Sequence, residues 1–116
     1  MQRLVIQTKI FSEILDGLIR KKQLLLKDYE ELEKSLVEHP KQGDVIPGLS
    51  GLRKIRLKSS YSGKQGGFRV DYLDIPKEEV LYLIVVYPKN LKEDLSSEEK
   101  REIKALVELL KNEVKV

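Results

Sequence analysis

The chain has 116 residues, with 22 Lys and Arg against 19 Asp and Glu, one His, and neither Cys nor Trp. That length suits a single domain over residues 1–116, and a hydrophobic fraction of 41% argues against wholesale disorder. The lack of cysteine excludes disulfides and thiolate metal sites, and the longest apolar run, residues 80–87, is too short to cross a bilayer. With no export signal at its start, the chain is expected to be soluble and cytoplasmic.

The first part of the chain predicts one strand and two helices. Residues 4–8 are rich in β-branched side chains, as strands are. Apolar residues recur at helical spacing over residues 11–19, and a second stripe predicts a helix over residues 22–38. Pro40 ends that helix, because the residue before a proline avoids the helical conformation. The two helices are joined tightly, which predicts an αα-hairpin.

A loop and three strands follow. Three glycines and a proline make residues 42–51 a loop, with a short extended piece at residues 45–46. The predicted strands cover residues 52–59, 68–73 and 80–87. A glycine-rich hairpin tip at residues 63–67 separates the first two strands, and a turn at residues 74–78 separates the last two.

The last helix begins with a capping signal. Ser96 and Glu99 have the spacing of a capping box, and acidic residues fill the first turn, where the helix dipole favours them. The order strand, helix, helix, three strands, helix predicts an α+β fold. We expect a small, mostly antiparallel sheet with an N-terminal αα-hairpin and a C-terminal helix, the helices packing on one face.

Positive charge is concentrated in the middle of the chain. Residues 51–72 hold six basic side chains and one acidic side chain, a net charge of +5. Residues 1–50 are neutral overall, and residues 73–116 carry a net charge of −2. A local basic field of this kind is typical of a site for a polyanion.

Basic and aliphatic residues alternate along the first strand of this basic segment. Because successive strand side chains point to opposite faces, Lys54, Arg56 and Lys58 share one face. Ile55 and Leu57 point the other way, into the core. No acid close in sequence neutralises the three cations. The sequence therefore predicts a basic sheet face.

Two arginines are placed by the same alternation. Arg53, near the start of the strand, points to the core face. If the strand pairs with the next one as a hairpin, Arg69 joins Lys54 and Arg56 on one surface. The alternative interpretation is a solvated basic face whose partners are acids on another element.

Lys89 lies at the end of the apolar strand. Strict alternation places it on the face of Leu83, Val85 and Tyr87, although an ordinary strand-to-helix connection explains the same residues. His39 is expected to cap a helix C-terminus rather than to catalyse. No second histidine, paired-carboxylate motif or metal-ligand spacing is present in the sequence, so neither a metal nor a cofactor is expected.

Three segments in register resemble the HigB-like branch of the RelE/ParE toxin superfamily. They are Gly43–Gly48 continuing through Gly51–Arg56, then Gly66–Val70, and then Tyr87–Leu95, followed by a C-terminal helix. The resemblance covers nearly the whole chain and is most specific between Gly43 and Leu95. It implies the RelE-like fold and the toxin of a type II toxin–antitoxin pair, a cytoplasmic protein held inactive by a helix-turn-helix antitoxin.

The resemblance also implies an activity. Members of this branch are ribosome-dependent endoribonucleases that cut mRNA in the A site, with no metal, no small-molecule cofactor and no membrane partner. The basic positions of their active face match Lys54, Arg56, Arg69 and Lys89, which are the predicted catalytic residues. Four more cations are predicted to bind RNA: Arg53, Lys58, Lys64 and Lys92.

Those residue types suit metal-free cleavage, in which the ribose 2′-OH attacks the neighbouring phosphorus. Arg56 and Arg69 would stabilise charge on the phosphoryl oxygens. Lys54, crowded by other cations, would act as the base, or as the acid once protonated, with Lys89 in the complementary role. Some relatives carry a tyrosine in the C-terminal segment that aids this step. Here no aromatic residue follows Tyr87, which either substitutes for it or packs in the core.

Two other functions remain open at this point. A non-nucleolytic gyrase inhibitor of the ParE kind would share the fold, although such members tend to lack a dense basic cluster on the central strands. A domain that binds RNA without cleaving it would share the basic patch and its salt-sensitive binding.

Overall fold

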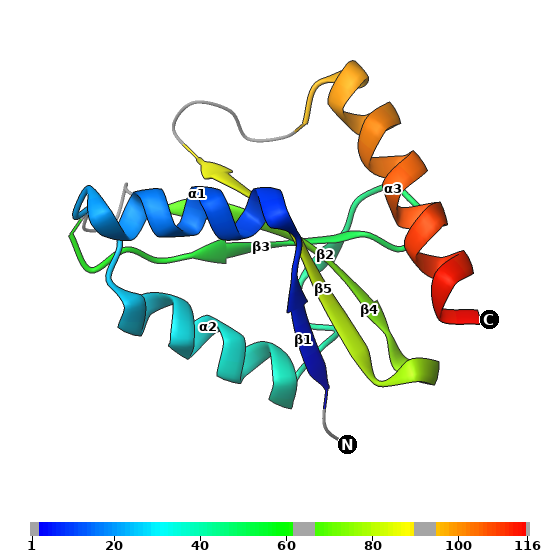
Figure 1. The fold of residues 1–116 in the computed structure, drawn as a ribbon, viewed down its shortest axis with the longest axis horizontal. Coiled ribbons are helices and arrows are strands. Elements are labelled where there is room, and N and C mark those ends of the chain that lie inside the picture. Colours follow the sequence, from blue (N-terminus) through cyan, green and yellow to red (C-terminus); the bar gives the residue numbers. More distant parts are fainter. Residues whose placement is uncertain (1–2, 62–66, 90–94, 116) are drawn as a thin grey trace.

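The computed structural model describes residues 3–61, 67–89 and 95–115 (Figure 1). The elements, in chain order, are β1 (Leu4–Gln7), α1 (Lys9–Arg20), α2 (Leu26–Glu38), β2 (Asp44–Val45), β3 (Arg53–Leu57), β4 (Phe68–Ile75), the 3-10 helix η1 (Pro76–Glu78), β5 (Val80–Pro88) and α3 (Ser97–Lys115). The predicted α+β fold is confirmed. No helix within the described ranges is long and apolar enough to span a membrane.

The five strands form one sheet in the order β1-β5-β4-β3-β2. β1 pairs with β5 in parallel, and every other pairing is antiparallel, so the expectation of a mostly antiparallel sheet is confirmed. The parallel pair requires a long crossover, which the helical hairpin and the three middle strands supply. β4 is therefore the central strand, flanked by β3 and β5.

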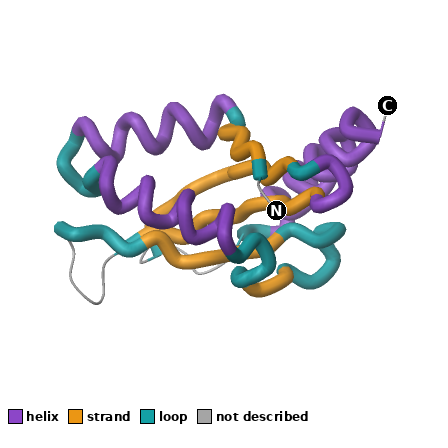
Figure 2. Tube along the Cα trace, turned by 90° about the horizontal axis from the view of Figure 1, so that it is seen from below, coloured by secondary structure: helices purple, strands orange, loops and turns teal. Residues whose placement is uncertain are grey.

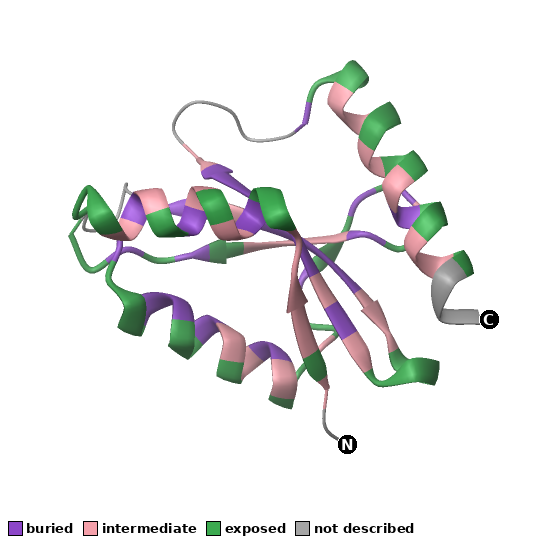
Figure 3. Cartoon of the chain, viewed as in Figure 1, coloured by how far each residue is buried: buried purple, intermediate pink, exposed green. Residues whose placement is uncertain are grey.

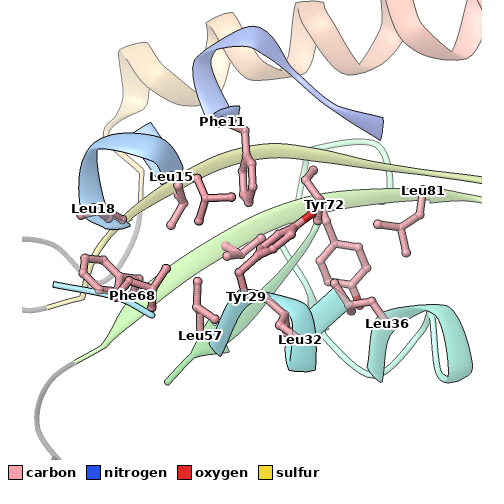
Figure 4. Packing of buried hydrophobic residues seen from close by; sticks show 14 residues of the cluster. Phe11, Leu15, Leu18, Tyr29, Leu32, Leu36, Leu57, Phe68, Tyr72 and Leu81 are labelled. Carbon is pink, nitrogen blue, oxygen red and sulfur yellow. The ribbon is translucent and has the colours of Figure 1, made fainter. Parts of the chain in front are cut away.

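The helical hairpin covers one face of the sheet (Figure 2). Thr8 starts α1 by accepting a hydrogen bond from the backbone N–H of Phe11 at 3.1 Å. Phe11 is fully buried and packs with Tyr29 of α2, their ring centroids 6.1 Å apart (Figure 4). The strands contribute Leu57, Phe68 and other apolar side chains to this first core. Phe68 is thus a core residue.

The second helix begins four residues later than its apolar pattern predicts. α2 starts at Leu26, because the side chain of Asp28 accepts a hydrogen bond from the backbone N–H of Leu25 at 3.0 Å and caps the helix there. Lys22, at the predicted start, has a φ of 58°, which no α-helix accommodates. His39 follows the last residue of α2, as expected of a C-cap.

Strand β5 departs from strict alternation at Ile84. Asp71 of β4 lies opposite Val85, but the next residue, Tyr72, lies opposite Leu83, which leaves Ile84 as an extra residue. This bulge turns Leu83 toward the hairpin core and Val85 toward the opposite face. The expectation that Leu83 shares a face with the residues leading to Lys89 is therefore wrong.

The last helix covers the opposite face from the hairpin, so the expectation that all helices pack on one face is also wrong. Its buried Val107 joins Ile84 and Tyr87 of β5 in a second core. The predicted capping box is confirmed: Ser96 N–H donates to Glu99 Oε1 at 2.9 Å, and Glu99 N–H donates to Ser96 Oγ at 3.2 Å. Figure 3 shows partly buried positions recurring along α3.

The segment predicted as a turn is shorter than expected. β4 continues to Ile75, and η1 turns the chain into β5 with Glu79 in the left-handed region at a φ of 56°. Asp74, at the end of β4, accepts hydrogen bonds from Arg3 Nε at 2.7 Å and Arg3 Nη2 at 3.4 Å. This nearly buried pair fastens the start of the chain to the sheet.

Candidate functional site

The β3–β4 hairpin brings three predicted cations onto one surface. Arg56 of β3 lies directly opposite Arg69 of β4, and Lys54 lies two residues away along β3. The predicted juxtaposition of Lys54, Arg56 and Arg69 is confirmed, and we call these three residues the basic face. Lys58 follows β3 in chain order and is exposed.

The three side chains of the basic face differ in how far they are exposed to solvent. Arg56 is exposed, whereas Lys54 and Arg69 are partly buried. The Arg69 Nε atom is buried and has no hydrogen-bond acceptor among the described residues. A buried donor in that state favours an incoming anion, because an acceptor would supply the missing hydrogen bond. Like charges directly opposite each other in a sheet also repel, which an anion bound between Arg56 and Arg69 would relieve.

One acid lies beneath the basic face, and the sequence did not single it out. Asp71 lies directly opposite Lys54, two residues after Arg69 on the same strand, and is 0% exposed. In the sequence it was a single acid counted against six cations. The signal that would have found its side of the sheet is its spacing of two residues from Arg69, which places both side chains on one face of the same strand.

Tyr87 points inward rather than toward the surface. It lies opposite Arg69, is 6% exposed, and donates its hydroxyl to Asp71 Oδ1 at 3.5 Å. Of the two roles left open for Tyr87, this geometry favours packing.

A second acid flanks Lys54 on the outer strand. Asp44 of β2 lies opposite Lys54 and is exposed. Lys54 therefore lies in register between a buried carboxylate on β4 and an exposed one on β2.

Arg53 faces the other way and is bound to the backbone. It lies opposite Tyr72, whose side chain belongs to the hairpin core. Its guanidinium donates to the carbonyl oxygens of Gly43 at 2.7 Å and Lys41 at 3.1 Å. This position does not support the prediction that Arg53 binds RNA, and it gives Arg53 the role of fastening the loop after α2.

Gly43 packs against the start of β3. Its N–H donates to the hydroxyl of Tyr72 at 2.9 Å, and that hydroxyl donates to the carbonyl of Pro40 at 2.8 Å. Burial raises the pKa of Tyr72, although the bond from Gly43 opposes this shift. A Cβ at position 43 would lie 2.8 Å from the carbonyl oxygen of Lys54 and from the Tyr72 ring. Glycine is therefore required where this loop meets the backbone of the basic face.

The chain beyond β3 is fastened to the helical hairpin. Asp28 accepts hydrogen bonds from Ser60 N–H at 2.9 Å and Ser60 Oγ at 2.5 Å, and Ser59 Oγ donates to the carbonyl of Gln23 at 2.6 Å. Burial acts to raise the pKa of Asp28, but the bonds from Ser60 and Leu25 outweigh it and hold the pKa below its usual value. These contacts fix the backbone next to Lys58.

The remaining predicted cations lie toward the end of β5. Lys89 follows β5, is partly exposed, and donates its backbone N–H to the carbonyl of Gly67 at 3.2 Å. This bond places Lys89 next to Gly67, which lies two residues before Arg69 in the chain. Lys64 and Lys92, both predicted to bind RNA, lie outside the described residues, as does most of the glycine-rich tip.

The sheet order, the helical hairpin on one face and the C-terminal helix on the other define the RelE-like fold. A structure of the E. coli toxin RelE, a mutant in the free state, is similar to this chain with a TM-score of 0.51 and 23% identity. The similarity covers 80% of this chain and 90% of that one. No family model matches the sequence. The predicted RelE-like fold is confirmed.

Proposed function

We propose that this chain is the toxin of a type II toxin–antitoxin pair, of the HigB-like kind, and that it cleaves mRNA in the ribosomal A site. The observation that carries the proposal is the convergence of Lys54, Arg56 and Arg69 on one open sheet face. The similarity to E. coli toxin RelE supports it, because the fold that carries this face is also the fold of a toxin. The proposed partners are the ribosome, mRNA and a helix-turn-helix antitoxin, in the cytoplasm.

In the proposed reaction the ribose 2′-OH attacks the adjacent phosphorus, and the 5′-oxygen of the next nucleotide leaves. The products are a 2′,3′-cyclic phosphate and a free 5′-OH. Arg56 and Arg69 hold the two non-bridging oxygens, where negative charge grows in the transition state. Their opposed positions across two paired strands allow both guanidinium groups to reach one phosphate. Preorganised charge of this kind usually accelerates a reaction more than any other single effect of an enzyme.

Two lysines are proposed to move the protons. Lys54 takes the proton of the 2′-OH or delivers one to the leaving 5′-oxygen, and Lys89 takes the complementary role. Lys58, with Lys64 and Lys92, contacts flanking phosphates. The ribosome holds the message so that the 2′-OH is in line with the scissile bond, which is itself a large rate contribution.

The test is cleavage of a defined mRNA on purified ribosomes, with the new ends mapped by primer extension. We expect cuts in the A-site codon that require the ribosome and leave a 5′-OH. The variants Arg56→Ala and Arg69→Ala should each lower the rate by about 100-fold or more, as loss of a transition-state donor does. The matched control is Lys34→Ala, which removes an exposed cation from α2, on the hairpin side of the sheet.

Two outcomes would reject the proposal. Binding of mRNA without any cut, by a folded protein, favours an RNA-binding domain. Inhibition of DNA supercoiling while translation continues favours a gyrase inhibitor.

A further inference from the structure

Asp71 is an acid in the middle of the sheet where an apolar residue would fit. It lies on β4, the central strand, and is 0% exposed. The residue before it, Val70, is fully buried, and the residue opposite it on β5 is Val85. Burying a carboxylate costs far more free energy than burying a valine unless the surroundings stabilise the charge. The buried carboxylate of Asp71 therefore requires neighbouring groups that stabilise its negative charge.

The strand register places three cations on the sheet face that Asp71 shares. Lys54 lies directly opposite on β3, at a separation of about 5 Å between Cβ atoms in such a pair. Arg69 is two residues earlier on β4, and Arg56 lies diagonally across the pair, about 7–8 Å away by the same geometry. The hydroxyl of Tyr87 donates to Asp71 Oδ1 at 3.5 Å from the β5 side.

Without a counter-charge these cations would repel one another. Arg56 and Arg69 are directly opposite, and like charges in that arrangement destabilise a sheet. A carboxylate held inside the sheet attracts each of them, and it does so more strongly than a surface acid because little water screens it.

We propose that Asp71 is a positioning residue for the basic face: its buried carboxylate holds Lys54, Arg56 and Arg69 together against their mutual repulsion. The effect of Asp71 on catalysis rests on the proposed function. Being fully buried, Asp71 does not touch the substrate and acts through the cations. Tyr87 keeps the carboxylate in place with its hydroxyl.

The first test is a double-mutant cycle measured by urea unfolding. The variants are Asp71→Asn, Lys54→Met and the two combined. We expect the effects of the two substitutions on the unfolding equilibrium constant to be non-additive by about tenfold. Removing Lys54 takes away a positive charge that stabilises the buried carboxylate of Asp71, so part of each effect is shared. Effects that add within twofold would overturn the inference. If Asp71→Asn alone does not fold, a folded double variant supports the coupling and an unfolded one overturns it.

The matched control is the cycle between Asp44→Asn and Lys54→Met. Asp44 is the other acid opposite Lys54, and the chemical change is identical, but Asp44 is exposed on β2. Solvent and salt screen such a charge, so its coupling to Lys54 should stay within twofold. Equal coupling at both positions would show that burial has no part in the effect and would overturn the inference.

The second test separates binding from catalysis. Asp71→Asn removes a negative charge beneath the basic face, so RNA should bind equally well or more tightly while kcat falls at least tenfold. A purely structural role predicts weaker binding and a lower kcat together, and that result would overturn the inference. If the wild-type protein cleaves no mRNA, the proposed function fails, whereas the unfolding cycle still decides the role of Asp71.

Discussion

The salt dependence of RNA binding gives a quantitative test of the basic face. Lys54, Arg56, Arg69 and Lys58 supply four cations on or beside one sheet face. Each phosphate neutralised on a single strand contributes about −0.7 to the slope of log K against log salt, so four contacts predict a slope of about −3. Affinity should then fall about 50-fold between 50 and 200 mM salt. Removing Arg69 should change the slope to about −2 and the fall to about 20-fold.

The assay is fluorescence anisotropy with a labelled single-stranded RNA, for the wild type, Arg69→Ala and Lys34→Ala. Lys34 is exposed on α2 and should leave the slope unchanged, although it carries the same charge. Equal slopes for wild type and Arg69→Ala, with both proteins folded, would show that Arg69 contacts no phosphate. An equal reduction by Lys34→Ala would show that net charge, rather than the basic face, binds RNA.

Two further predictions concern the contacts that support the site. Asp28→Asn should lower the free energy of unfolding by about 2 kcal/mol at neutral pH, because Leu25 and Ser60 donate three hydrogen bonds to its charged carboxylate. The folded-state pKa of Asp28 is lowered, so the stability that its carboxylate contributes is present above pH ~4 and is lost as the pH falls through the folded pKa. The difference in unfolding free energy between wild type and Asp28→Asn, measured by urea unfolding, should therefore be smaller in acid than at neutral pH. Gly43→Ala should destabilise by about 1–3 kcal/mol, because its Cβ would lie 2.8 Å from backbone and ring atoms, and a melting temperature equal to wild type would contradict that packing.

The element order and the basic face were predictable because both follow from local periodicity. The alternation of Lys54 and Arg56 with aliphatic residues assigns their faces, and hairpin pairing of two adjacent strands then brings in Arg69. The capping box at Ser96 was equally local, because it depends on two side chains three residues apart.

The features that the sequence did not reveal depend on partners far away in the chain. The bulge at Ile84, which turns Leu83 to the other face, exists only in the pairing of β5 with β4. The burial of Asp71 depends on three strands meeting, so its charge could be counted but not located. A helix has the same apolar stripe whichever face of the sheet it covers. The pattern of α3 therefore could not show that it packs on the face opposite the helical hairpin.

The most direct test of the proposed function is a map of RNA 5′ ends in cells expressing the protein. We expect new 5′-OH ends inside translated reading frames within minutes of induction, present with Lys34→Ala and absent with a folded Arg69→Ala protein. Growth arrest without new ends in translated frames would contradict the proposed mRNA cleavage. The same ends in cells expressing Arg69→Ala would contradict the assignment of the site.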